Sequence, residues 1–151
     1  GKAFGVNGGY VVSSSEVITF LRETSPTYVY SNPITVSESE AAIQAVDILD
    51  SDEGRNLLNH LSQVTQRFQD GLKAAGFETI EGAHPVVPLM VRDTQKTKAI
   101  VGYLAENGIL ATGLAYPVVP QGDEEIRFQV CADHTQQDID YVLDVLKNYK
   151  G

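Results

Sequence analysis

The residue with the clearest chemistry of its own is Lys2, which stands at the start of a glycine-rich stretch, GKAFGVNGGY. A lysine amine attacks a carbonyl group only when it is uncharged, and burial or nearby positive charge favours that form. The same pattern also fits a solvated lysine next to ordinary turns, so this stretch alone leaves both interpretations open.

Further residues of the sequence have side chains that bind substrates or cofactors in other proteins. Arg127 lies in a predicted strand between Ile126 and Phe128, a position that by pattern alone favours an exposed arginine. Ser31 and Asn32 come directly before Pro33, a position that is typical of turn residues. His134 precedes the last predicted helix, where a turn at the helix start explains it at least as well as catalysis.

The composition indicates a mildly acidic protein and argues against several classes of function. The chain has 151 residues, of which 42% are hydrophobic, and a formal net charge of -9. These values suit one ordinary domain, or a small domain that carries an extra segment, and disfavour binding to nucleic acid or to an anionic membrane. The single cysteine, Cys131, cannot form an internal disulfide, and no cluster of Cys and His has metal-ligand spacing. No apolar run is long enough to cross a bilayer, so we predict a soluble, cytoplasmic protein.

The first part of the sequence, residues 1–36, does not predict a self-sufficient fold. Residues 9–12 are expected to form a short buried strand, and residues 28–30 a second extended piece. A helix is expected between them, with its N-cap at Ser14 or Ser15. This part therefore looks like the edge of a larger domain.

A long helical arm is predicted from residue 37 onward. Ser37 and Glu40 have the spacing of a capping box, and apolar residues then repeat at helical intervals. The pattern is interrupted before Gly54, resumes, and stops at Gly76, a residue type that often terminates helices. We therefore expect an arm that is kinked or broken near Gly54.

The rest of the sequence alternates between strand and helix patterns. Strands are predicted at residues 77–80, 86–91, 109–115 and 125–130, and helices at residues 94–107 and from about Thr135, which has cap spacing with Asp138. The first two strands are joined without a helix, and so are the last two. This pattern indicates a mixed or mainly antiparallel sheet with helices on one face. The predicted fold class is a two-layer α/β (α+β) domain over residues 37–151, with a domain boundary near Val36.

Three segments of the sequence carry a resemblance to a known enzyme family. They are GKAFGVNGGYV around Lys2, YVYSNP around Ser31, and GILATGLAYPVVPQGDEEIRFQVCADHT near the C-terminus. These segments resemble the α-oxoamine synthases, pyridoxal phosphate enzymes that join an amino acid to an acyl-CoA. The last segment is most similar to the glycine C-acetyltransferase branch. The resemblance implies a fold type I PLP-dependent transferase, in which residues 1–36 are a remnant of the large cofactor-binding domain and residues 37–151 are the C-terminal small domain.

The resemblance also implies roles for four residues. Lys2 would be bound covalently to pyridoxal 5′-phosphate and would then serve as the base that removes the α-proton of the amino acid. Ser31, and more weakly Asn32, would contact the cofactor phosphate of a neighbouring subunit, which implies a homodimer with shared active sites. Arg127 would clamp the substrate carboxylate with its planar guanidinium fork, and we favour this role over that of an exposed strand arginine.

The reaction that the resemblance implies is the condensation of glycine with acetyl-CoA to 2-amino-3-ketobutyrate, with release of CoA. One alternative is an 8-amino-7-oxononanoate synthase, which uses alanine and a pimeloyl thioester. Another is a non-catalytic α/β binding or dimerisation module. The sequence offers no convincing acid for the pyridinium nitrogen of the cofactor and no convincing stacking group for its ring. We therefore expect a C-terminal fragment that binds the cofactor poorly and is inactive by itself.

Overall fold

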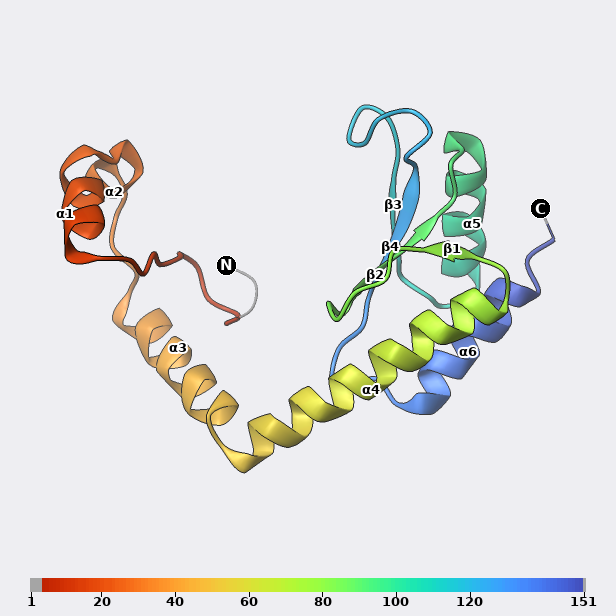
Figure 1. Cartoon of the computed structure of the whole chain (residues 1–151), viewed down its shortest axis with the longest axis horizontal. Coiled ribbons are helices and arrows are strands. Elements are labelled where there is room, and N and C mark those ends of the chain that lie inside the picture. The colour runs from red at the N-terminus through yellow and green to blue at the C-terminus, as the bar shows by residue number, and fades with distance from the viewer. Residues whose placement is uncertain (1–3, 151) are drawn as a thin grey trace. The chain divides into compact units, whose positions relative to one another are not determined.

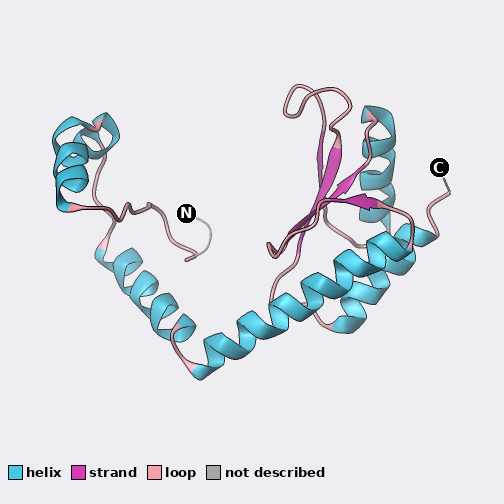
Figure 2. Ribbon diagram, viewed as in Figure 1, coloured by secondary structure: helices cyan, strands magenta, loops and turns pink. Residues whose placement is uncertain are grey.

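The computed structural model describes residues 4–150, so Lys2 lies outside the described residues. The described chain forms two compact units that divide between Arg55 and Asn56, here called the first and the second unit. Figures 1 and 2 show the helices of the first unit and the helices and strands of the second. The predicted domain boundary near Val36 stays a prediction.

The first unit consists of three helices and the start of a fourth: α1 (Ser15–Thr24), α2 (Pro26–Tyr30), α3 (Val36–Leu49) and α4 (Asp52–Ala74). Helix α1 begins after its N-cap Ser14, as predicted. The prediction of an extended piece at residues 28–30 is wrong, because these residues belong to α2. Pro26 stands at the first position of that helix, where its fixed φ angle suits a helix and its missing N–H costs nothing.

The prediction of a buried strand at residues 9–12 is also wrong. These residues are irregular and exposed, and residues 4–55 contain no strand that could pair with them. An isolated extended segment has no partner for its backbone N–H and C=O groups, so an apolar run alone does not make a strand.

Helix α3 begins with a capping box that lies two residues before the predicted one. The Thr35 hydroxyl accepts a hydrogen bond from the Glu38 N–H at 3.3 Å, and the Glu38 carboxylate accepts one from the Thr35 N–H at 3.1 Å. The prediction of Ser37 and Glu40 is wrong because both residues already lie inside the helix. The Glu38 carboxylate also accepts a hydrogen bond from the Asn7 side chain at 2.8 Å. The pKa of Glu38 lies below its usual value, chiefly because of the Thr35 N–H and then because of Asn7.

The helical arm is broken near Gly54, as predicted, at Asp50 and Ser51. Gly54 itself lies in the first turn of α4, packed against the end of α3. A Cβ atom at Gly54 would lie 2.3 Å from the carbonyl oxygen of Ile48. No residue with a side chain fits this close approach without a backbone shift.

Helix α4 ends with the glycine signal that the sequence predicts. Gly76 has a φ angle of +82°, in the left-handed region that favours glycine. Its N–H donates to the carbonyl oxygen of Lys73 at 2.9 Å, and the Phe77 N–H donates to that of Leu72 at 3.0 Å. These two bonds satisfy carbonyl groups at the end of the helix.

The second unit contains a four-stranded sheet in the order β1-β2-β4-β3. The strands are β1 (Glu78–Thr79), β2 (Val86–Met90), β3 (Thr112–Leu114) and β4 (Glu125–Gln129). Every neighbouring pair is antiparallel, which confirms the prediction of a mainly antiparallel sheet. The two central strands have five residues each, whereas the edge strands are shorter, with two residues in β1 and three in β3.

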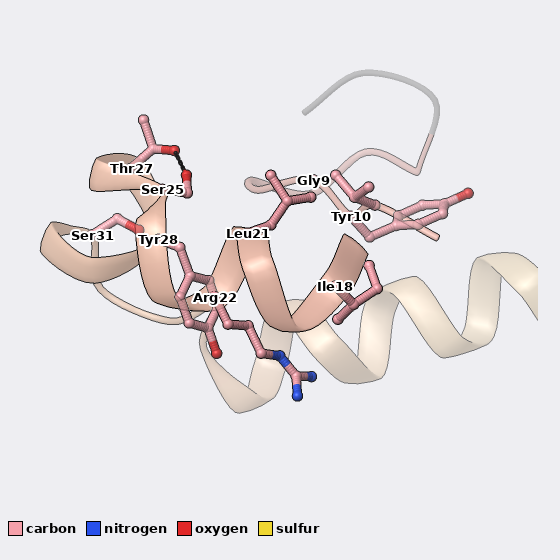
Figure 3. Close-up of a pocket in the computed structure, with 10 residues that line it drawn as sticks. Gly9, Tyr10, Ile18, Leu21, Arg22, Ser25, Thr27, Tyr28 and Ser31 are labelled. Atoms are coloured by element: carbon pink, nitrogen blue, oxygen red, sulfur yellow. Dashed lines mark hydrogen bonds between the residues drawn. The ribbon is translucent and has the colours of Figure 1, made fainter. Parts of the chain in front are cut away.

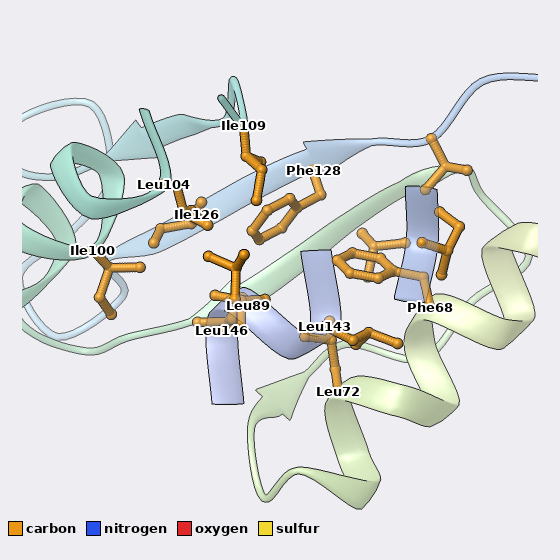
Figure 4. Close-up of a cluster of buried hydrophobic side chains, with 14 of the residues drawn as sticks. Phe68, Leu72, Leu89, Ile100, Leu104, Ile109, Ile126, Phe128, Leu143 and Leu146 are labelled. Atoms are coloured by element: carbon orange, nitrogen blue, oxygen red, sulfur yellow. The ribbon is translucent and has the colours of Figure 1, made fainter. Parts of the chain in front are cut away.

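One face of this sheet is covered by α4, α5 (Thr94–Glu106) and α6 (Gln136–Lys147), and Figure 4 shows the side chains buried there. The helices contribute Phe68, Leu72, Ile100, Leu104, Leu143 and Leu146, and the central strands contribute Val87, Leu89, Ile126 and Phe128. The rings of Phe68 and Phe128 meet edge to face, with centroids 5.1 Å apart. The prediction of a two-layer domain with helices on one face is therefore confirmed.

Candidate active site

Arg127 lies on the open face of the sheet, opposite to the helices. Successive side chains of a strand point to opposite faces, and Ile126 and Phe128 are buried in the core. The Arg127 side chain therefore points to the other face, where it is 52% exposed. Its cross-strand neighbours are Pro88 on β2 and Thr112 on β3. The arginine that the sequence predicts to bind a carboxylate is thus accessible and is carried by a central strand.

The guanidinium group of Arg127 is held by Glu125, which is two residues earlier on β4 and therefore on the same face. The Nε–H of Arg127 donates a hydrogen bond to Oε1 of Glu125 at 2.6 Å. The Glu125 side chain is only 9% exposed, so the acid is far more buried than the base. Within residues 4–150 the structure records no other hydrogen bond to this guanidinium group. Its two terminal amino groups therefore remain available to a ligand.

The neighbouring acid, Glu124, has a structural role instead. Its carboxylate accepts hydrogen bonds from the Thr94 hydroxyl and from the Gly122 N–H, both at 2.9 Å. The pKa of Glu124 lies below its usual value, first because its own backbone N–H donates to the carboxylate and further because of Thr94 and Gly122. These bonds attach the start of α5 to the loop before β4.

A hollow of about 470 Å³ lies beside Arg127 on the open face. It is lined by Gln69, Ile80, Glu81, Gly82, His84, Val86, Pro88, Glu125 and Arg127. The Nδ1 atom of His84 accepts a hydrogen bond from the Val86 N–H at 3.1 Å, which fixes the tautomer with the proton on Nε2 when the ring is neutral. A small carboxylate ligand fits the volume and the donor set of this hollow.

Ser31, the candidate phosphate ligand, directly follows α2 in the first unit. Figure 3 shows it on the wall of a hollow of about 610 Å³, together with side chains from α1 such as Leu21 and Arg22. The nearby hydroxyl groups of Ser25 and Thr27 are 2.9 Å apart and bond to each other. Ser31 is exposed, so its hydroxyl can donate to a phosphate oxygen, which fits the predicted role.

The remaining predicted residues are placed less favourably or are not described. Asn32 is exposed and does not line the hollow beside Ser31. Lys2 lies outside residues 4–150, and Ser31 and Arg127 belong to different units. His134 closes the turn before α6: its Nδ1 accepts from the Cys131 N–H at 3.2 Å, which supports the structural explanation.

Sequence reasoning missed Glu125 and His84, which line the same hollow as Arg127. The position of Glu125 two residues before Arg127 in a predicted strand is a signal that places both on one face. No comparable signal exists for His84, since its place depends on how the loop between β1 and β2 folds. Within residues 4–150 no cluster of His, Cys, Asp and Glu has the geometry of a metal site, and none of the described helices is long and apolar enough to cross a membrane.

Comparison with protein families gives a match over nearly the whole chain. The family model described as aminotransferase class I and II matches residues 1–146. Among curated proteins, 8-amino-7-oxononanoate synthase of Thermosipho melanesiensis is 34% identical over 95% of the chain, and mitochondrial 2-amino-3-ketobutyrate coenzyme A ligase of Mus musculus is 35% identical over 93%. The chain covers 36% and 33% of these two proteins, about a third of their length.

Solved structures confirm the predicted fold. A high-resolution structure of SPT with PLP matches 97% of this chain with a TM-score of 0.88 at 24% identity, and the match covers 37% of that chain. The 8-amino-7-oxononanoate synthase of Francisella tularensis matches 97% with a TM-score of 0.80 at 20% identity, covering 42% of that chain. At these identities the likeness establishes the fold alone. It agrees with the fold type I transferase that the sequence predicts.

Proposed function

The chain belongs to the aminotransferase class I and II family, and from this premise we propose that the protein carrying it is an α-oxoamine synthase. Such an enzyme condenses an amino acid with an acyl-CoA and releases CoA. The observation that carries the proposal is the similarity of more than nine-tenths of the chain to two enzymes of this kind. The accessible Arg127 on the open face of the sheet adds a group suited to an amino-acid carboxylate.

The cofactor of this reaction is pyridoxal 5′-phosphate, as predicted from the sequence, in agreement with the family match and with the structures of SPT with PLP. The bound cofactor supplies an electron sink that stabilises negative charge at the amino-acid α-carbon. Lys2 would hold it covalently and move the proton at that carbon. Ser31 would donate a hydrogen bond to a phosphate oxygen, with Asn32 as a weaker second candidate. Arg127 would bind and orient the substrate carboxylate with its terminal amino groups.

Glycine and acetyl-CoA are our first choice of substrates, because the late segment of the sequence is most similar to the glycine C-acetyltransferase branch. The comparisons support the alternative almost equally, since the mouse ligase and the Thermosipho synthase differ by one percentage point in identity, 35% against 34%. The alternative is condensation of alanine with a pimeloyl thioester. A homodimer with shared active sites and a cytoplasmic location remain part of the proposal, and the mouse relative is mitochondrial.

The proposal is tested with the full protein that carries this chain. The protein is incubated with pyridoxal phosphate and either glycine with acetyl-CoA or alanine with pimeloyl-CoA, and free CoA is measured with a thiol reagent. Release with glycine and acetyl-CoA supports the first choice, and release only with alanine and pimeloyl-CoA supports the alternative. No release with either pair contradicts both substrate choices, and no release with any other pair of amino acid and acyl-CoA would favour a binding module.

The role of Lys2 is tested on the same protein by borohydride reduction and peptide mass spectrometry. The reduced cofactor should be found on the peptide that contains Lys2, and the variant Lys2→Ala should lose both this adduct and CoA release. Lys98→Ala is the matched control, because Lys98 is an exposed lysine on α5. An adduct that persists in Lys2→Ala would rule out this lysine.

A further inference from the structure

We propose that Glu125 is a positioning residue that orients the Arg127 guanidinium group for the substrate carboxylate. This inference rests on the proposed function, in which Arg127 binds the amino acid. It adds a second residue to the recognition of the substrate, one that touches the arginine rather than the substrate itself.

The geometry of the pair orients the guanidinium group. Glu125 and Arg127 are two residues apart on β4, so the strand itself places both side chains on the open face. The Nε–H of Arg127 donates to Oε1 of Glu125 at 2.6 Å. A charge-assisted bond of this length fixes the plane of the guanidinium group, because Nε and the terminal amino groups are coplanar. The direction of the two terminal amino groups is then set by the strand and the acid together.

Burial distinguishes Glu125 from the other acids that pair with arginines in the second unit. The Glu125 side chain is 9% exposed, whereas the acids in the other arginine pairs of the second unit are about half exposed: Asp140 with Arg67, and Glu78 and Asp123 with Arg92. A nearly buried carboxylate needs a charged partner, because burial of an unpaired charge is costly. Among the described residues, Arg127 is the only hydrogen-bond partner recorded for the Glu125 carboxylate. Glu125 therefore has little freedom to move, and it holds Arg127 more firmly than an exposed acid would.

The terminal amino groups of Arg127 remain for the substrate. The bond to Glu125 uses Nε, so the terminal amino groups stay free to bind a carboxylate through two parallel hydrogen bonds. The hollow of about 470 Å³ beside them has room for a small amino acid. Because Glu125 neutralises the charge of Arg127, the site does not attract anions by net charge. It selects them by the match between a planar fork and a planar carboxylate.

The kinetic test uses the full protein with its active substrate pair and the variants Glu125→Ala and Glu125→Gln. Loss of orientation in Glu125→Ala should raise the KM for the amino acid about tenfold with kcat changed less than about threefold. Glu125→Gln keeps the acceptor oxygen, so its KM for the amino acid should stay close to that of the natural protein. Glu106→Ala, which removes an exposed acid at the end of α5, should leave both constants unchanged. A lower KM in both Glu125 variants would mean that the acid only weakens anion binding, and would overturn the proposal.

A second readout needs no activity. In the protein labelled with ¹⁵N-arginine, the Nε–H signal of Arg127, assigned from its loss in Arg127→Lys, should exchange slowly with water. It should exchange rapidly in Glu125→Ala and slowly again in Glu125→Gln. Equal exchange in all three proteins would overturn the positioning role.

The failures of the two proposals are distinguishable. If Arg127→Lys leaves the KM for the amino acid unchanged while the Nε–H signal depends on Glu125, the role of Arg127 in substrate binding is wrong but the ordered pair is real. If Arg127→Lys raises the KM and Glu125→Ala does not, the carboxylate clamp is supported and Glu125 is not its positioning residue.

Discussion

The two units differ in how much apolar surface they bury. Every buried hydrophobic side chain among the described residues belongs to the second unit, from Val64 to Leu146. The helices α1, α2 and α3 of the first unit contain no buried residue, and large apolar side chains such as Phe20 and Tyr30 are exposed there.

The difference separates two sources of helical structure. In the first unit the helices depend on local signals such as the Thr35 capping box, which determine where a helix begins but stabilise it only weakly. In the second unit the same kinds of signal are joined to a packed core, so the helices and the sheet should unfold together. Substitutions of the same type in the two units should therefore have unequal effects.

The largest difference is expected between two phenylalanines. Phe68 is 2% exposed in the core, and Phe20 is 64% exposed on α1. In the 151-residue chain, Phe68→Ala should lower the free energy of unfolding by about 3–5 kcal/mol through lost burial and a cavity, whereas Phe20→Ala should change it by less than about 0.5 kcal/mol. Urea denaturation followed by circular dichroism measures both. Similar losses would show that the first unit has a core of its own.

Packing density in the second unit is tested at two helical glycines. A Cβ atom at Gly71 would lie 2.2 Å from a methyl carbon of Leu143, whereas a Cβ at Gly102 on α5 would meet nothing within 4 Å. Gly71→Ala should therefore cost about 1–3 kcal/mol through overpacking. Gly102→Ala should stabilise the chain by up to about 1 kcal/mol, because alanine has the higher helix propensity. Thermal unfolding of the two variants gives the comparison, and equal shifts in the same direction would contradict it.

The two capping boxes form a matched pair, one in each unit. Thr35 caps α3 and Thr135 caps α6, each with an acid three residues later. Thr135→Ala should lower the free energy of the cooperative unfolding transition by about 1 kcal/mol. Thr35→Ala should reduce the helical signal of α3 and leave that transition in place. A shift of the transition by Thr35→Ala would indicate that α3 unfolds with the second unit.

The smallest effect is expected from pH. The pKa of Asp138 lies below its ordinary value of 3.8, first because of the Thr135 hydroxyl and then because of the Thr135 N–H. A lowered folded pKa means that the stabilisation is full above pH 3.8 and is lost as the pH falls through the lowered value.

The measurement compares two amide variants as a function of pH. The stability difference between the natural chain and Asp138→Asn should therefore vanish in acid, as followed by urea denaturation. The pKa of Glu38 in the first unit is lowered as well. The variant Glu38→Gln should differ from the natural chain only in its helical signal. A difference that grows in acid would contradict a folded pKa of Asp138 that lies below the ordinary value.

The sequence predicts the second unit better than the first, and the reason is physical. The helix end at Gly76 and the helix start at Thr135 depend on neighbouring residues alone, so short patterns determine them. The apolar pattern of residues 9–12 predicts a strand, but a strand also needs a partner that the pattern does not contain. Two overlapping capping patterns, TVSE and SESE, occur within six residues at the start of α3, and propensity does not decide between them.

The candidate site was predicted in part. The alternation of β4 places Arg127 on the face opposite to Ile126 and Phe128, and this follows from the sequence alone. The burial of Glu125 does not, because an acid in a short strand is more often exposed and its environment depends on the neighbouring strands. The relation of Ser31 to its hollow likewise depends on α1 and α2 packing against each other.

The short edge strands of the sheet have a consequence for solubility. An edge strand offers unpaired N–H and C=O groups to any extended segment of another chain, and a long edge invites fibre-like pairing. Here β1 and β3 offer only two and three residues at the two edges of the sheet. Growth of the sheet from one molecule to the next is therefore disfavoured at both edges. Association between copies of this chain should instead depend on side-chain surfaces, where specificity is easier to encode.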